Sequence, residues 1–492
     1  MPITTDLSSE TINFKNNLND YPEFKKTRMD FWDGIWGKFR NKIGFGSYYH
    51  KRLLQVYQHI LLADSSVIEL GCGNGKLLGK LHCKKKVGVD FSYEAIELAK
   101  ARYPECQFIR ADALEFRHDE TYDYIILSDL INDLWDIQMV FENVNPLCHS
   151  RTRIIINYYS KLWEGPLKLV QALGLKKPLL EQNWLTSGDV RGLLYLTEFE
   201  VIKTWQEILL PVRIPLLNGF INKFLVKVAL IRHIALTNFV ISRPAPKKFP
   251  PRKTNLVSVI VAARNEAGHI KEIIERVPQI GLGTELIFVE GNSTDNTYDV
   301  IVNEINNHPD KNIKLFKQPG TGKGDAVRKG FSEANGDILM ILDADLTVPP
   351  EKLPLFFDAL VSNKGEFING VRLVYPMEKQ AMRFFNLLGN KFFSFIFTYL
   401  LGQLVRDTLC GTKVLWKADY HKISSNRSYF GDFDPFGDFD LIFGAAKLNL
   451  KIQDLPVRYK ERFYGTTNIK RWKHGWILLR MVLFAAKKLK YK

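Results

Sequence analysis

The chain has 492 residues, room for about two to four domains, and its 46% hydrophobic and 25% charged residues exclude a mainly disordered chain, a coiled coil and a collagen-like fibre. Of its net charge of +15, 13 charges come from two stretches, 242–255 and 466–492, so the rest is nearly balanced. This distribution argues against an extended nucleic-acid groove and favours contact of the C-terminus with an anionic membrane.

The cysteines and the N-terminus indicate the compartment. The five cysteines are odd in number and lack CxxC spacing, which predicts reduced thiols and neither disulfides nor a zinc site. The segment MPITTDLSSETINFKNNLND is polar and has no apolar core of a signal peptide. We therefore expect a cytoplasmic protein, peripheral to the inner face of the membrane.

One stretch, SRPAPKKFPPRKTN, is rich in proline and lysine and cannot continue a helix or a central strand. It predicts a linker over 244–255 between a first domain, 1–243, and a second, 256–465. The remaining residues, 466–492, form a basic amphipathic tail. For this tail, a packed C-terminal helix with a solvated basic end is the alternative to membrane contact.

Strand-like runs alternate with helical patterns in both halves. In the first half, strands are expected at 66–70, 86–90, 107–112, 122–129 and 153–158, with helices at 93–101 and near 135–147. In the second half, strands are expected at 256–263, 285–290, 313–317 and 337–345, with helices near 269–276, after Thr297 and near 325–334. The alternation predicts an α/β protein with two doubly wound, mainly parallel sheets, whose ligands bind beyond the carboxyl ends of the strands.

A glycine-rich turn follows the first expected strand. The sequence ELGCGNG, Glu69 to Gly75, lacks the third glycine of the dinucleotide pattern, where Lys76 stands. Gly71, Gly73 and Gly75 permit close approach of the backbone to a ligand. The next two strands end in Asp90 and Asp112, so three strand ends in order carry matching features.

With the strand YDYIILSD, these features resemble the class I S-adenosylmethionine-dependent methyltransferases from about Tyr49 to Pro244. The resemblance implies a Rossmann-like fold that binds S-adenosylmethionine. By the same resemblance, the turn from Glu69 holds the methionine portion, Asp90 the ribose hydroxyls and Asp112 the adenine amino group, while Asp129 borders the methyl group.

The methyl acceptor is not identified by any motif. Asp129, Asp133, Tyr158 and Tyr159 are candidates for a base, and each is equally well explained as a packing or surface residue. The apolar stretch from Ile208 to Leu236 is interrupted by prolines and basic residues. We expect it to be a substrate-side cap or a packing insertion and not a membrane span.

In the second half, DILMILDAD ends an apolar run with Asp343 and Asp345. Paired carboxylates at the edge of a buried sheet are typical of a cation site. Mg²⁺ or Mn²⁺ held there with substrate phosphate oxygens would stabilise a departing nucleoside diphosphate.

Together with LVSVIVAARNE and FVEGNSTDNT, this pattern resembles glycosyltransferase family 2, of the GT-A nucleotide-diphospho-sugar transferase fold, from Leu256 to about Phe463. The family usually has two aspartates before GSTD, where this chain has Glu290 and Gly291. The resemblance implies that Glu266, Glu290, Lys323 and Asp343 contact the nucleotide-sugar. The segment GTGKGDAVRKG lacks the spacing of a P-loop.

A finer match is to the dolichyl-phosphate and undecaprenyl-phosphate sugar transferases, through NGVR and VRDTLCGTKVLW. By this resemblance, the acceptor phosphate is bound by Arg372, Arg406 and Lys413. The alternative is that these residues are ordinary surface cations. Between these motifs, the run 384–405 has a small or polar residue every fourth position. Such a helix suits an in-plane or a buried position better than a span.

The segment FGDFDPFGDFD supplies two candidates for the general base of sugar transfer, Asp438 and Asp440. A phosphate acceptor would need no base. The leading hypothesis is a bifunctional, membrane-associated enzyme that methylates and that transfers sugar from a nucleotide-sugar to a lipid-linked or envelope glycan acceptor, without nucleic acid. The alternatives are a soluble enzyme that tailors a small molecule, and a glycosyltransferase whose first domain binds the cofactor without turnover.

Overall fold

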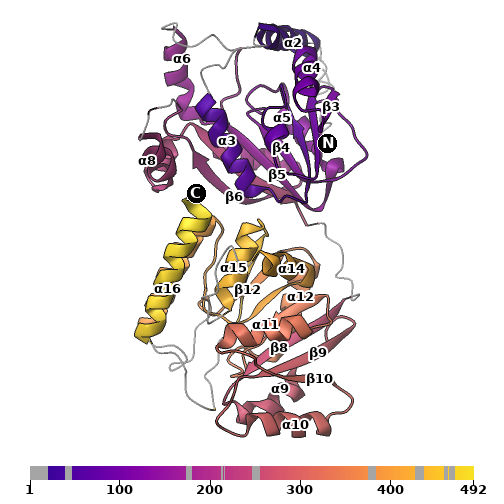
Figure 1. Ribbon diagram of the computed structural model, residues 1–492, viewed down its shortest axis with the longest axis vertical. Coiled ribbons are helices and arrows are strands. Elements are labelled where there is room, and N and C mark those ends of the chain that lie inside the picture. Colours follow the sequence, from indigo (N-terminus) through magenta and orange to yellow (C-terminus); the bar gives the residue numbers. More distant parts are fainter. Residues whose placement is uncertain are drawn as a thin grey trace, which may run out of the picture. The chain divides into compact units, whose positions relative to one another are not determined.

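The computed structural model describes residues 20–38, 47–172, 180–211, 214, 217–246, 255–374, 384–426, 437–458, 464 and 471–491. The chain forms two compact units, Met1–Ala245 and Pro246–Lys492 (Figure 1). Each unit is an α/β domain built on a mainly parallel sheet, as the alternation of strands and helices predicts. The predicted fold class is therefore confirmed.

The sheet of the first unit has the strand order β3-β2-β1-β4-β5-β7-β6. Its strands are β1 (Ser66–Leu70), β2 (Lys85–Asp90), β3 (Gln107–Arg110), β4 (Tyr122–Ser128), β5 (Cys148–Tyr159), β6 (Phe199–Glu207) and β7 (Thr237–Pro244). The first five are parallel to one another, and β7 runs antiparallel to both β5 and β6. In the register, Leu70 of β1 pairs with Val89 and Leu127, so the ends of β1, β2 and β4 meet at one edge.

The helices of the first unit flank this sheet. They are α2 (Tyr21–Lys38), α3 (Ser47–Ile60), α4 (Tyr93–Arg102), α5 (Ile137–Val144), α6 (Glu164–Ala172), α7 (Ser187–Leu196) and α8 (Leu217–Lys223). Short 3₁₀ turns are η1 (Leu78–Lys80), η2 (Asn145–Leu147), η3 (Lys161–Trp163), η4 (Leu225–Lys227) and η5 (Ile231–Ile234). Two apolar clusters, one on each face of the sheet's buried strands, form the core, as alternate residues of β4 show: Ile125 and Leu127 belong to one and Tyr124 and Ile126 to the other.

The second sheet has the order β10-β9-β8-β11-β13-β12-β14. Its strands are β8 (Leu256–Ala263), β9 (Gly283–Glu290), β10 (Asn312–Lys317), β11 (Ile338–Ile341), β12 (Phe367–Val371), β13 (Lys413–Trp416) and β14 (Ile452–Pro456). Strand β13 is antiparallel to both β11 and β12, which makes the sheet mixed. Strand β11 is shorter than expected: it ends at Ile341, so Asp343 and Asp345 lie in the loop that follows.

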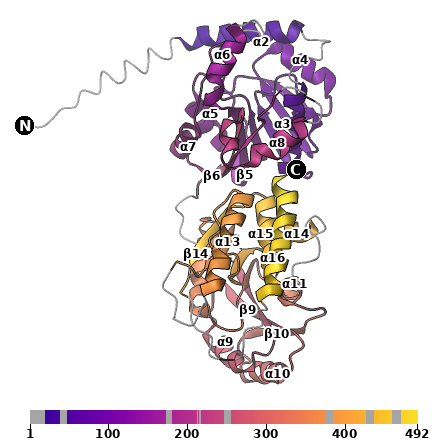
Figure 2. The same cartoon turned by 90° about the vertical axis from the view of Figure 1, so that its left-hand side faces the viewer.

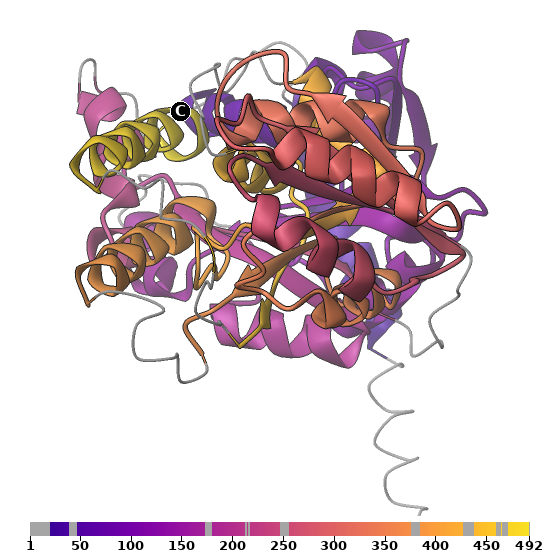
Figure 3. The same cartoon turned by 90° about the horizontal axis from the view of Figure 1, so that it is seen from below.

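The helices of the second unit are α9 (Ile270–Arg276), α10 (Thr297–Asn307), α11 (Lys323–Glu333), α12 (Leu353–Val361), α13 (Phe384–Leu401), α14 (Lys417–Ser425), α15 (Asp438–Lys447) and α16 (Arg471–Ala485). The 3₁₀ turns η6 (Ala267–His269) and η7 (Pro350–Lys352) precede α9 and α12, and the π-helical turn η9 (Ala486–Lys490) follows α16. Helices α13 and α16 run side by side (Figures 2 and 3).

The C-terminal segment is a packed helix. Leu478, Met481 and Val482 of α16 are buried, and the Lys490 ammonium donates to the Tyr399 carbonyl of α13 at 2.5 Å. Within the described residues, no helix combines the length and the apolar character needed to cross a bilayer.

Candidate active sites

The glycine-rich turn of the first unit lies at the carboxyl end of β1. Gly71, Gly73 and Gly75 have φ values of +71°, +51° and +69°, which other residues rarely adopt. A Cβ at Gly71 would lie 2.7 Å from Leu130, and one at Gly75 would lie 2.7 Å from Phe108. The close packing explains why glycine stands at these positions.

Asp90, at the end of β2, is tied to this turn. Its carboxylate accepts hydrogen bonds from the backbone N–H of Gly73 at 2.8 Å and of Ser92 at 2.9 Å. Burial raises the pKa of Asp90 to about 6, although the two N–H groups oppose this rise. The Asp90 carboxylate therefore lies beside the turn, where the two N–H groups offset part of the effect of burial on its pKa.

Glu69 lies one residue before the end of β1 and is buried. Burial raises its pKa well above the usual range, and the neighbouring Asp90 raises it further. Its Oε2 atom has no hydrogen-bond partner among the described residues. A bound group with an N–H or O–H donor would satisfy this buried oxygen.

Helix α2 supplies contacts to this edge that the sequence did not predict. The Tyr21 hydroxyl donates to Asp112 at 2.6 Å, and the Lys25 ammonium lies 3.3 Å from the same carboxylate. The Trp36 ring lies 3.1 Å from the position of a Cβ at Gly73. Asp112, predicted to contact adenine, is therefore already engaged by a helix that covers the glycine turn.

Asp129 follows β4 with a φ of +56°, a strained backbone conformation for a residue other than glycine. It accepts hydrogen bonds from the Tyr49 hydroxyl at 2.7 Å and from the Asn157 amide at 2.6 Å. Desolvation raises its pKa to about 7, while the bonds from Tyr49 and Asn157 lower it. This carboxylate can hold or release a proton near neutral pH.

The other candidate bases of the first unit are less suited to proton transfer. Asp133 pairs with the Arg28 guanidinium and accepts a hydrogen bond from the Trp32 indole at 2.7 Å, both from α2. Tyr158 is buried in the core of the sheet. Burial raises the pKa of Tyr159, and Asp129 raises it further.

In the second unit, Glu290 is the last residue of β9, and Glu266 lies three residues past the end of the adjacent strand β8. Both are buried. Glu290 accepts a hydrogen bond from the backbone N–H of Ser293 at 2.5 Å, and Glu266 lies 2.8 Å from the His269 imidazole. Each acid thus fixes the loop that follows its own strand.

Lys323 and Asp343 form the polar centre of this edge. The Lys323 ammonium, at the start of α11, donates to Asp343 at 2.6 Å. Burial alone would raise the pKa of Asp343, but the charges of Lys323, Arg372 and Lys413 hold it below its usual range. Three predicted phosphate-binding cations therefore act on one predicted metal-binding carboxylate.

The donor set fits a divalent ion held jointly with a substrate. Among the described residues, no three acidic, histidine or cysteine side chains converge as a complete metal site. Asp345 accepts a hydrogen bond from the Thr347 hydroxyl at 2.7 Å. Two carboxylates, Asp343 and Asp345, suit Mg²⁺ or Mn²⁺ when phosphate oxygens and waters complete the shell.

Arg372 makes a buried ion pair that the sequence did not predict. Its guanidinium donates to both oxygens of Asp407, at 2.7 and 2.9 Å. Asp407 also accepts from the Asn390 amide of α13 at 2.8 Å. These bonds orient Arg372. The other two predicted phosphate-binding cations differ in burial. Lys413 is buried and its ammonium donates to the Cys410 carbonyl, whereas Arg406 is exposed.

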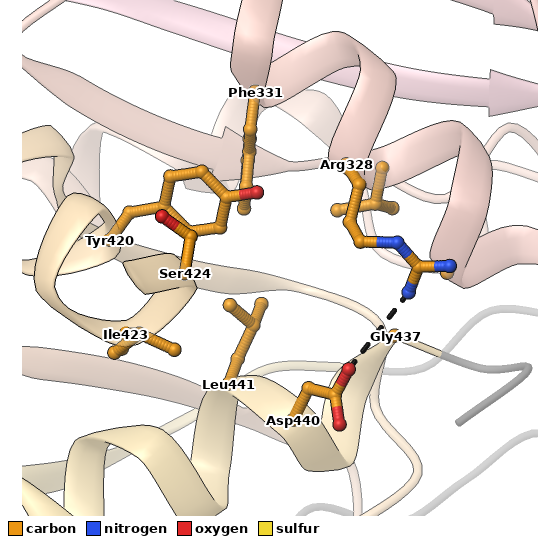
Figure 4. A pocket seen from close by; sticks show the side chains of 10 residues that line it. Arg328, Phe331, Tyr420, Ile423, Ser424, Gly437, Asp440 and Leu441 are labelled. Atoms are coloured by element: carbon orange, nitrogen blue, oxygen red, sulfur yellow. Dashed lines mark ion pairs between the residues drawn. The ribbon is translucent and has the colours of Figure 1, made fainter. Parts of the chain in front are cut away.

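The two candidate bases lie at the start of α15. The side chain of Asp438 lies outside the described residues. Asp440 lines a small pocket between α11, α14 and α15, with its Oδ2 atom 3.9 Å from Arg328 (Figure 4). A Cβ at Gly437 would lie 2.6 Å from the Cα of Gly324, so the starts of α11 and α15 touch.

Each half of the chain matches the model of a known protein family. Residues 61–201 match the model of a methyltransferase domain, and residues 258–423 match that of glycosyl transferase family 2. The chain therefore carries a methyltransferase domain and a family 2 glycosyltransferase domain, as the two resemblances predicted.

Sugar transferases that act on polyprenyl phosphates, by their names, are among the relatives of this chain. A dolichol-phosphate mannosyltransferase of Pyrococcus furiosus is 32% identical over 27% of this chain and 38% of its own length. An undecaprenyl-phosphate 4-deoxy-4-formamido-L-arabinose transferase of Proteus mirabilis is 27% identical over 32% of this chain and 48% of its own length. The chain thus spans less than half the length of these two relatives.

Solved structures of both kinds are also similar. A possible histamine N-methyltransferase of Thermotoga maritima is 14% identical, with a TM-score of 0.35 over 44% of this chain and 98% of its own. A glucosyl-3-phosphoglycerate synthase of Mycobacterium tuberculosis, solved with Mn²⁺ and UDP, is 18% identical, with a TM-score of 0.36 over 48% of this chain and 80% of its own.

Proposed function

We propose that the protein is a bifunctional transferase. Its first unit, within the proposed domain 1–243, transfers a methyl group from S-adenosylmethionine, and its second, within 256–465, transfers sugar from a nucleotide-sugar to a polyprenyl phosphate. The observation that carries the proposal is the contact of 2.6 Å between the Lys323 ammonium and the Asp343 carboxylate, whose pKa Arg372 and Lys413 also lower. Several cations around an anion-binding edge fit a donor diphosphate and an acceptor phosphate together.

For the second unit, we assign Asp343 and Asp345 to a divalent ion, which when bound supplies charge stabilisation for the diphosphate leaving group. Lys323 and Lys413 add fixed positive charge at the same edge, and Glu266 and Glu290 shape the loops for the nucleotide. A phosphate oxygen of the acceptor attacks the anomeric carbon. The bond from that carbon to the diphosphate breaks, and its electron pair leaves with the nucleoside diphosphate.

A phosphate acceptor carries its own charge, because its second pKa is about 6. Most of the phosphate is then doubly ionised near neutral pH, so no base is essential and Asp440 is assigned a positioning role. Its Oδ2 atom lies 3.9 Å from Arg328, which keeps both groups beside the start of α11. A sugar hydroxyl as acceptor would instead require Asp438 or Asp440 to take a proton.

For the first unit, S-adenosylmethionine when bound supplies an electrophilic methyl group. Gly71, Gly73 and Gly75 let the backbone approach it, Asp90 accepts bonds from its ribose, and Asp112 faces its adenine once Tyr21 yields. Asp129, with a pKa of about 7, is positioned to take the proton that a methyl acceptor releases.

We also propose that the second unit binds the inner membrane surface peripherally. Helix α13 turns its polar side inward, where Asn390 is buried and Ser394 donates to the Val405 carbonyl, and leaves Phe392 and Phe395 exposed. Helix α16 exposes a mixed apolar and basic face comprising Trp476, Arg480, Leu483 and Lys487. Apolar side chains flanked by cations suit an anionic lipid surface.

The acceptor assignment is tested with two isoprenoids of equal chain length, one ending in phosphate and one in hydroxyl. Each is incubated with Mg²⁺ or Mn²⁺ and a panel of nucleotide-sugars, and the products are separated by mass spectrometry. We expect sugar on the phosphate alone. Transfer to the alcohol at an equal rate would contradict the phosphate acceptor and return Asp440 to the role of a base.

A further inference from the structure

Helix α8 of the first unit is an amphipathic helix with its polarity reversed. Asn218 and Asn222, four residues apart, point inward and are 7% and 1% exposed. On the other side, Leu217 and Phe220 are 48% and 58% exposed. Surface helices of water-soluble proteins bury the apolar side, so this orientation indicates that something other than water contacts α8.

The reversal is fixed by hydrogen bonds. The Asn222 carbonyl accepts from the backbone N–H groups of Leu209 and Leu210 at 2.7 and 2.9 Å. The Asn222 amide donates to the Leu210 carbonyl at 2.8 Å and to the Tyr48 hydroxyl at 3.1 Å. Rotation of the helix to hide Phe220 would break these hydrogen bonds, so the bonds hold Phe220 on the outer side.

The exposed apolar surface continues beyond α8 into the two short turns that follow it. Val228, Leu230 and Ile234 are 43%, 87% and 60% exposed. With Leu217 and Phe220 they form what we call the α8 patch, named after the helix labelled in Figure 1.

The charge around the α8 patch selects its partner. No aspartate or glutamate occurs from Ile208 to Asn238, whereas Lys223 and Arg232 lie among the apolar residues. The charge of Lys227 is matched internally, because its ammonium pairs with the buried Glu207. The segment thus combines exposed apolar side chains with cations and contributes no acid of its own, which is complementary to an anionic lipid surface.

We propose that the α8 patch docks the methyltransferase unit on an anionic membrane. The residues concerned differ from those of α13 and α16, so this inference does not depend on the membrane contact proposed for the second unit. The expectation of a substrate-side cap or packing insertion over 208–236 stays a prediction. The segment packs through its asparagines and presents its apolar side chains outward.

The first test is hydrogen exchange of the full chain with vesicles of phosphatidylcholine, with or without phosphatidylglycerol. We expect amides of 217–234 to gain protection only with the anionic vesicles. No gain, or an equal gain with the neutral vesicles, would overturn the proposal. Protection that instead rises with protein concentration, without vesicles, would identify a second copy of the chain as the partner and would also overturn it.

The second test compares vesicle partition of two exposed double variants, both made in a chain that also carries Trp476→Ser and Leu483→Ser. Phe220→Gln with Leu230→Gln should lower partition by about tenfold or more, because two apolar side chains no longer enter the interface. Tyr195→Gln with Leu196→Gln, on the exposed end of α7, is the matched control and should change little. Equal partition of the two variants, at equal thermal midpoints, would overturn the α8 patch while leaving the tail contact untouched.

Discussion

The Lys323 ammonium lies 2.6 Å from Oδ1 of Asp343, so the first residue of α11 is joined to the loop that follows β11. In the proposed function, Asp343 would hold a divalent ion and Lys323 would contact the phosphates of the donor.

Asp345→Asn is expected to abolish sugar transfer, because the loss of one of two carboxylates removes the proposed ion. S-adenosylmethionine affinity should be unchanged, since Asp345 belongs to the other unit. Calorimetry with Mn²⁺ and a donor-hydrolysis assay measure both effects. Asp358→Asn, an exposed change on α12, is the matched control. Full transfer by the Asp345 variant would remove the metal assignment.

Asp90→Ala is expected to weaken S-adenosylmethionine binding by ~1.5–3 kcal/mol, the range for hydrogen bonds to a charged group. Asp119→Ala, in an exposed loop, is the control. Titration calorimetry gives both affinities. If the affinity of the Asp90 variant equals that of the control, the ribose contact has been assigned to the wrong residue.

The pH dependence of cofactor binding follows from the same carboxylate. Its pKa is raised to about 6 by burial, and the ionised form is the one that accepts the ribose hydroxyls. Affinity should therefore be full well above pH ~6 and should fall as the pH drops through that value. Titrations from pH 5 to 8 test this, and Asp90→Ala should flatten the profile. A wild-type profile that is flat across this range would argue against Asp90.

Asp407→Asn is expected to destabilise the second unit by ~3–5 kcal/mol, because Arg372 would remain buried without its counter-charge. The pKa of Asp407 is held far below its usual range mainly by Arg372, against the effect of burial, so this stabilisation persists at neutral pH. Hydrogen exchange of amides in β12 and β13 reports the local free energy of unfolding. Asp299→Asn, an exposed change on α10, is the control and should leave that exchange unchanged. If Asp407→Asn also leaves it unchanged, the ion pair between Arg372 and Asp407 contributes little to stability.

The exposed face of α16 offers a test of membrane contact that leaves the core intact. Deletion of residues 468–492 would also remove the buried Leu478 and Met481, so paired substitutions are the better design. Arg480→Gln with Lys487→Gln should weaken binding to anionic vesicles by ~1 kcal/mol per cation, most visibly at low salt. Co-sedimentation across a salt series measures this binding. The control is the double variant Lys271→Gln and Lys364→Gln, which removes the same number of charges elsewhere. Identical sedimentation of both pairs would reject α16 as a membrane contact.

The sequence predicted the strands well where burial is continuous. Strand β8 spans the expected 256–263, because a parallel strand covered on both faces appears as an unbroken apolar run. The glycine turn and Asp90 could be placed from sequence for the same reason: each directly follows such a run. The expectation for β11 ran too far, because the apolar run continues to Leu342 while the strand ends at Ile341.

Contacts between distant segments could not be predicted from local patterns. Tyr21 reaches Asp112 across 91 positions, and Asp407 takes Arg372 as a partner across 35. The periodicity of α13 correctly marked a polar side but not which side faces the protein. The side that faces the protein depends on two distant hydrogen-bond acceptors. The Asp407 carboxylate accepts from the Asn390 amide, and the Val405 carbonyl accepts from the Ser394 hydroxyl.

The central claim, two transfer reactions on one chain, is tested by mass spectrometry of the products. The full chain is incubated with methyl-labelled S-adenosylmethionine, a panel of nucleotide-sugars, a divalent cation and polyprenyl phosphate with candidate glycan acceptors. We predict a glycosyl polyprenyl phosphate that is lost with Asp345→Asn, and a methyl-labelled product that is lost with Asp90→Ala. Sugar transfer that never reaches polyprenyl phosphate would contradict the proposed acceptor. Bound S-adenosylmethionine whose methyl label reaches no acceptor would contradict the proposed methyl transfer.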